Sequence, residues 1–128
     1  MRKYVYWIST GVLALLYLAS ATFYITQGDM VRQLLGNLGF PAYLVPILIT
    51  VKLLGVAAIL SRVNVALSDL AYAGMLFHLL LALSAHLNGA DYSGAPPAVV
   101  GLMLLAVSFL TQNAARVKPS PYAPARPL

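Results

Sequence analysis

Four long apolar runs, separated by short polar segments, dominate the chain. Each run is long enough to cross about 30 Å of hydrocarbon as an α-helix, which rises about 1.5 Å per residue. A shorter segment between the first two runs shows a helical alternation of apolar and polar residues instead. The pattern therefore predicts an all-α membrane protein, a four transmembrane helix bundle with a short interfacial helix. The expected spans are 4–26, 41–61, 66–87 and 96–113.

The first run contains the sequence Ala-Ser-Ala at residues 19–21, which is similar to a signal-peptidase site. The apolar part of a signal peptide spans only about 7–15 residues, and this run is longer. We therefore interpret the run as a retained helix.

The short segment, residues 28–39, has its apolar side chains on one face. Asp29 is placed to cap its start and Gly39 to end it. A helix of this length lies in the membrane interface rather than crossing the bilayer. We interpret it as a connector, and a lid over the bundle is the alternative.

Composition agrees with a membrane protein, because 61% of the 128 residues are hydrophobic and only 9% are charged. A soluble domain carries roughly 25% charged residues. The spans leave residues 1–115 as one transmembrane domain and 116–128 as a Pro-rich cytoplasmic tail. The absence of Cys excludes disulfides and thiolate-bound metal clusters.

The basic residues gather at the ends of the spans, and this placement indicates orientation rather than nucleic-acid binding. On one side of the bundle the only basic residue is Arg32, and its charge is offset by Asp29 and Asp91. We expect an integral protein of the bacterial inner (cytoplasmic) membrane with both termini cytoplasmic. The cytoplasmic side would carry Arg2, Lys3, Arg62, Arg116, Lys118 and Arg126.

Lys52 is the most informative residue, because it lies near the middle of the second run. A charge at that depth costs at least about 2.5–3.5 kcal/mol, so it needs a partner or a purpose. Counting inward from the helix ends places His78, Tyr17 and Ser108 within about one turn of the same depth. Asp69 is about 13 Å from His78 along the helix axis and cannot neutralise this layer. The four residues form either a ligand or proton site, or a polar clasp that holds the helices in register.

The third helix carries small residues above and below a single imidazole, a pattern typical of close helix packing. This stripe directs His78 into the bundle. On the opposite side we expect Asp69 to pair with Arg62 or with the start of its own helix. The stripe consists of Ala71, Gly74, His78, Ala82 and Ala85.

Other chemistries find no support. His78 and His86 are about 12 Å apart along one helix and cannot ligate opposite faces of one haem. A diiron carboxylate site needs Glu, which the chain lacks. No phosphate-binding loop or nucleophile–base–acid set is present. We therefore expect no catalytic residue and no metal site, and we interpret His86 as an interfacial polar residue.

Several short motifs, in this order and spacing, resemble the DoxX-like family of small integral membrane proteins. They are YWISTG (6–11), LGFPAYL (38–44), VKLLG (51–55), AYAG (71–74), SAHL (84–87) and VSFL (107–110). The resemblance implies a four-helix membrane bundle. It matches Lys52 to a lysine in the family's second helix and His86 to a histidine after the third. Position 78 departs from the family pattern, because His78 stands where an acidic residue often follows the phenylalanine.

The better-known relatives implied by this resemblance are a subunit of a thiosulfate:quinone oxidoreductase and membrane parts of oxidative-stress complexes. We expect a non-catalytic accessory or structural subunit that contacts membrane lipids and other membrane subunits, or itself as a homo-oligomer. One alternative is a quinone-binding subunit of an oxidoreductase complex, with quinone as the only cofactor. The other is a small transporter or proton pathway.

The orientation generates a first prediction. Reporter fusions at Gly28, Asn64, Tyr92 and Leu128 should report outside, inside, outside and inside in turn, because four crossings return the chain to its starting side. Paired phosphatase and fluorescent-protein fusions would measure this. A C-terminal fusion that is active outside the cytoplasm would contradict the topology.

Overall fold

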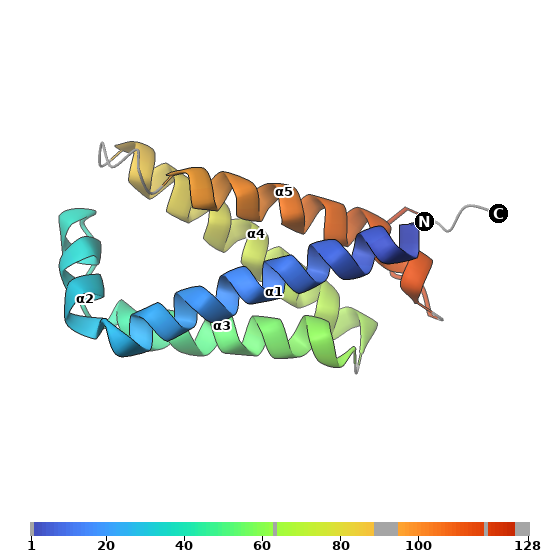
Figure 1. Cartoon of the computed structure of the whole chain (residues 1–128), viewed down its shortest axis with the longest axis horizontal. Helices are drawn as coiled ribbons and strands as arrows, with labels where there is room; N and C mark the ends of the chain where they lie inside the picture. The colour runs from blue at the N-terminus through green and yellow to red at the C-terminus, as the bar shows by residue number, and fades with distance from the viewer. Residues whose placement is uncertain (1, 63, 89–94, 117, 125–128) are drawn as a thin grey trace.

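The computed structural model is an all-α bundle of long helices lying side by side, with one short helix across an end (Figure 1). It describes residues 2–62, 64–88, 95–116 and 118–124. Four helices are long and apolar enough to cross a membrane, which confirms the predicted fold class. The elements are α1 (Arg2–Thr26), α2 (Gly28–Asn37), α3 (Leu44–Ser61), α4 (Val65–Asn88), α5 (Ala95–Thr111) and the 3₁₀ helix η2 (Gln112–Ala115).

The second span begins later than the sequence predicted. Helix α3 starts at Leu44, whereas Pro41 was expected to open it. Pro46 therefore lies in the first turn, where backbone N–H groups have no partner within the helix. The proline costs no hydrogen bond at this position.

Gly39 terminates the short helix α2 as expected, because this glycine, two residues after the last helical residue, adopts the left-handed region with φ of 91°. The backbone N–H of Phe40 then donates to the carbonyl of Leu35 at 2.8 Å, which closes the helix end. The expectation for Asp29 is wrong. No side chain caps the helix start, and the Asp29 carboxylate accepts a hydrogen bond from Arg32 at 3.0 Å instead.

The long helices form a four-membered ring in which α1 and α4 are diagonal. Helix α1 packs against α3 and α5, and α4 packs against the same two helices. The core between them is aromatic and aliphatic, and a smaller apolar cluster joins α2 to α3 through Val31, Leu35 and Val45. The core consists of Leu13, Ala14, Tyr17, Val56, Ile59, Tyr72, Met75, Leu79 and Leu105.

The basic end of the bundle, which carries Arg2, Arg62 and Arg116, is tied together by polar side chains. Arg62 donates to the carbonyl of Ala115, and its guanidinium carbon lies 5.1 Å from the centroid of the Trp7 ring. Asp69 does not pair with Arg62, contrary to expectation. The Asp69 carboxylate accepts hydrogen bonds from the Ser120 hydroxyl at 2.7 Å and from the Gln112 amide at 3.4 Å.

The described part of the tail therefore folds back onto the bundle. Asn113 is buried, its side-chain oxygen accepts from the Ser120 N–H at 2.7 Å, and its amide donates to the carbonyls of Ser120, Ala123 and Pro124. These bonds replace the water that a Pro-rich segment without regular structure would otherwise need. The division into a domain ending at residue 115 and a separate tail stays a prediction.

Candidate functional site

Lys52 lies inside the bundle, with only 4% of its surface exposed. Its amino nitrogen is 4.3 Å from the centroid of the Tyr24 ring and 6.0 Å from that of Tyr17. Both distances are in the range of cation–π contacts. In the described part of the chain no carboxylate lies within 4.0 Å of Lys52, since the one ion pair there joins Arg32 to Asp29. Among the described residues, two aromatic faces therefore surround the amino group of a lysine that lies at membrane depth.

Tyr17 connects Lys52 to His78. The Tyr17 hydroxyl and Nδ1 of His78 form a hydrogen bond of 3.1 Å, and the two ring centroids are 5.6 Å apart. When Nδ1 accepts the hydrogen bond from the Tyr17 hydroxyl, the neutral imidazole carries its own hydrogen on Nε2. The site then offers two donors, the Lys52 amino group and the His78 Nε2–H.

A cavity of about 170 Å³ lies against these side chains. It is lined by the diagonal helices α1 and α4, by Lys52 of α3 and by the start of α5. We call it the Lys52 cavity. Its lining consists of Leu16, Tyr17, Ser20, Tyr24, Lys52, His78, Leu79, Ala82, His86, Pro97 and Ala98.

Ser108, the fourth residue expected in this layer, lies in a different group. Its hydroxyl forms hydrogen bonds with Thr10 at 2.5 Å and with Tyr72 at 2.6 Å, and it is fully buried. These three residues, which we call the hydroxyl cluster, join α5 to α1 and α4. The structure thus brings Lys52, Tyr17 and His78 together and places Ser108 where it joins helices.

His86 was expected at the membrane interface, and the structure places it on the wall of the Lys52 cavity. It is half-buried, as is Ala82, which lies one turn earlier on α4. The stripe of small residues therefore borders a cavity at this end of α4 instead of receiving a neighbouring helix. Gly74, in the same stripe, is exposed.

Tyr24 makes the shorter of the two ring contacts with Lys52, and the sequence argument did not single it out as a site residue. A signal was nevertheless present. Tyr17 and Tyr24 are seven residues apart, and this spacing places two side chains on the same face of a helix.

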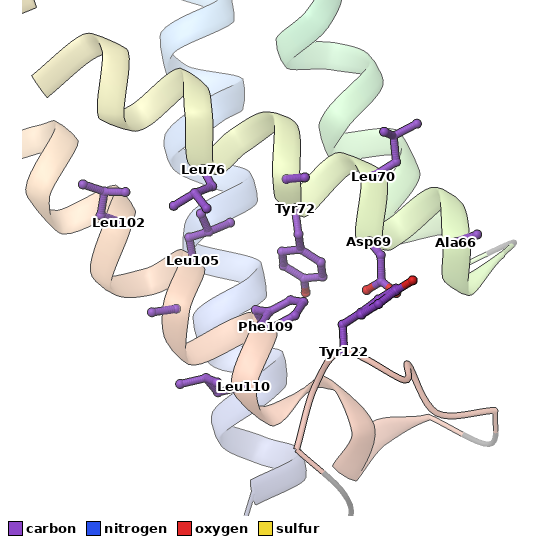
Figure 2. Close-up of a pocket in the computed structure, with 12 residues that line it drawn as sticks. Ala66, Asp69, Leu70, Tyr72, Leu76, Leu102, Leu105, Phe109, Leu110 and Tyr122 are labelled. Carbon is purple, nitrogen blue, oxygen red and sulfur yellow. The ribbon is translucent and has the colours of Figure 1, made fainter. Parts of the chain in front are cut away.

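A second and larger hollow, about 640 Å³, lies between α4 and α5 on the outer surface of the bundle. Figure 2 shows Tyr122 of the tail beside Asp69 at one end of it, with Phe109 and Tyr72 facing them. The Tyr72 and Phe109 rings meet edge to face, with centroids 5.5 Å apart. We call this hollow the α4–α5 groove. Its lining is almost entirely apolar, whereas the lining of the smaller Lys52 cavity includes several polar side chains.

Among the described residues no three His, Cys, Asp or Glu side chains gather where a metal ion could be held. The Lys52 cavity presents nitrogen donors and aromatic faces in an apolar surrounding. Such a site is suited to a molecule with acceptor oxygens.

A four-helix bundle with a buried lysine, a buried tyrosine and a half-buried histidine around one cavity defines a small integral membrane protein with an internal polar site. The sequence profile of the DoxX-like family matches residues 8–108, so this chain belongs to the DoxX-like family. No curated protein and no solved structure matches it. The match includes every residue that lines the Lys52 cavity, from Leu16 to Ala98.

The hydroxyl cluster generates a second prediction. Ser108→Ala should lower the free energy of unfolding by about 1 kcal/mol, because it removes two interhelical hydrogen bonds of the size measured in membrane proteins. Thr22→Ala is the matched control, since Thr22 is exposed and its hydroxyl bonds only to the Leu18 carbonyl of its own helix. Reversible unfolding in mixed micelles would measure both variants. Equal stability of the two would contradict a clasp at Ser108.

Proposed function

We propose that this protein is a membrane subunit that binds the headgroup of a quinone-type molecule between Lys52 and His78. The single observation that carries the proposal is the burial of Lys52 beside a cavity, in the middle of a membrane span, where tyrosine rings and, among the described residues, no carboxylate lie close to its amino group. A lysine at that depth is unfavourable in free energy, and ligand binding is a reason for the protein to retain it.

The chemistry of the donors favours a carbonyl-bearing ring as ligand. A quinone presents acceptor oxygens and a flat ring, and the cavity presents donors on Lys52 and His78 with aromatic faces on Tyr17 and Tyr24. The relatives implied by the sequence resemblance include a quinone-linked oxidoreductase subunit, which supports the same ligand class.

The third prediction tests this site. Lys52→Met should weaken binding of tetramethyl-benzoquinone by about 10- to 100-fold, the loss expected for one hydrogen bond to a charged group. Methionine approximately keeps the length of the side chain and removes its amino group, so the bundle should still assemble. Calorimetric titration of the protein in nanodiscs, with empty nanodiscs subtracted, would measure the affinity.

Lys118→Met is the matched control, because Lys118 is exposed and far along the chain from the cavity. It should bind the quinone as the unmodified protein does. If folded Lys52→Met also keeps full affinity, Lys52 is a structural residue, and the change would then alter stability by about 1 kcal/mol or less.

The α4–α5 groove supports a second candidate function, that of an accessory subunit in a larger membrane assembly. The groove is open at the surface, and large apolar side chains such as Leu70 and Leu76 stand exposed along it. An open apolar groove between two membrane helices is a suitable seat for a helix of another subunit, because close packing drives association in lipid. The two functions are compatible, since the groove and the Lys52 cavity share no lining residue.

The fourth prediction tests the groove. The chain has no cysteine, so a photoreactive probe can be attached at a single introduced Leu76→Cys. Illumination in native membranes should yield defined adducts with protein. Leu15→Cys on α1, where the leucine is 67% exposed, is the control and should yield lipid adducts. Lipid adducts alone at both positions would contradict the accessory function.

A further inference from the structure

We infer that the ligand of the Lys52 cavity is amphipathic and that its hydrocarbon tail lies in an apolar cavity beneath α2. This inference rests on the proposed function, because it assumes that the Lys52 cavity holds a polar headgroup. It adds the part of the molecule that the donors on Lys52 and His78 leave unspecified.

A second cavity of about 290 Å³ adjoins the Lys52 cavity. The two have four lining residues in common, which are Tyr24, His78, Ala82 and His86. The Lys52 cavity alone is smaller than the roughly 300–1,000 Å³ of most small-molecule sites, and the two joined reach that range. A ligand held by Lys52 and His78 therefore has adjacent space to extend into.

The chemistry of the wall changes from one cavity to the next. Lys52, Tyr17 and Ser20 line only the first cavity, whereas Phe23 of α1, Leu35 of α2 and further apolar residues of α2 and α3 line the second. A headgroup with acceptor oxygens fits the first wall, and a hydrocarbon chain fits the second. The order of the two walls gives the ligand a direction, with the head inside the bundle and the tail towards α2.

The second cavity exists because α2 spans one end of the bundle without packing on α4. Helix α2 contacts α1 and α3, where Val31 and Leu35 are buried against Val45. In the described residues it has no packing contact with α4, and Figure 1 shows it lying across the ends of the long helices. The α4 wall beneath it includes Ala82 and Ala85, whose short side chains leave the space open.

The interfacial helix therefore has a role beyond connecting two spans. It forms the roof of the tail cavity, and the bilayer interface where such a helix lies is the place from which an amphipathic molecule enters. The surrounding lipid solvates a hydrocarbon tail as well as the cavity does. The cavity therefore selects a tail by its shape, because moving the tail out of lipid brings no hydrophobic free energy.

The test fills the tail cavity without touching the head cavity. Ala85→Phe adds a ring to a residue that lines only the cavity beneath α2, and Ser84→Phe adds the same ring to the exposed neighbouring position. Each variant is titrated in nanodiscs with tail-less tetramethyl-benzoquinone and with decyl-benzoquinone. Ala85→Leu, a smaller addition, is measured alongside in case the phenylalanine prevents folding.

We expect Ala85→Phe to weaken binding of decyl-benzoquinone by about tenfold or more, because the tail and the added ring compete for one space. Binding of tetramethyl-benzoquinone should stay within about twofold, and Ser84→Phe should change neither. Equal losses for the two quinones, or no loss for either, would overturn the inference while Lys52-dependent binding stands. If the unmodified protein binds neither quinone, the proposed function itself fails.

Discussion

Every polar group inside the hydrocarbon must find its partner within the protein, and this constraint organises the whole molecule. It explains why the spans are helical, since helices satisfy their own backbone N–H and C=O groups. It also explains why buried polar side chains occur in groups. The Thr10, Tyr72 and Ser108 hydroxyls bond to one another, and Tyr17 bonds to His78. Lys52 has aromatic faces but no acceptor among its described contacts, and the proposed ligand would supply one.

The architecture could be predicted because it depends on length and polarity along the chain. Four apolar runs and one short amphipathic segment define the bundle without any knowledge of which helices touch. The start of α3 was less predictable, because Pro41 is suited to a first turn, but the helix begins only at Leu44. The left-handed Gly39 separates α2 from this start, and a sequence pattern indicates such a glycine more easily than the exact residue where the next helix begins.

The depth of Lys52, His78 and Tyr17 was predictable, whereas Ser108 lies at the level of Thr10, about 10 Å along α1 from Tyr17. Counting from helix ends gives the height of a side chain in the membrane, and by this measure Lys52, His78, Tyr17 and Ser108 were equivalent. Which of them meet depends on how each helix is rotated and which neighbours it has at each level, and Thr10 and Tyr17 lie two turns apart on one face of α1. Tyr17 points to the Lys52 cavity, whereas Thr10 on the same helix reaches Ser108 on α5. The position of Asp69 was missed for a similar reason, because its partner Ser120 comes from the Pro-rich tail.

The cross-ties at the basic end make the bundle mechanically unequal along its length. There the guanidinium of Arg62 holds the carbonyl of Ala115 and covers Trp7, while Asn113 and Asp69 fasten the tail. At the opposite end α2 rests on a few apolar side chains above hollow space. In a bundle that is cross-linked at one end and loosely covered at the other, the helices separate most easily at the loosely covered end. Small spreading motions of the helices would therefore be greatest near α2 and least beside Arg62.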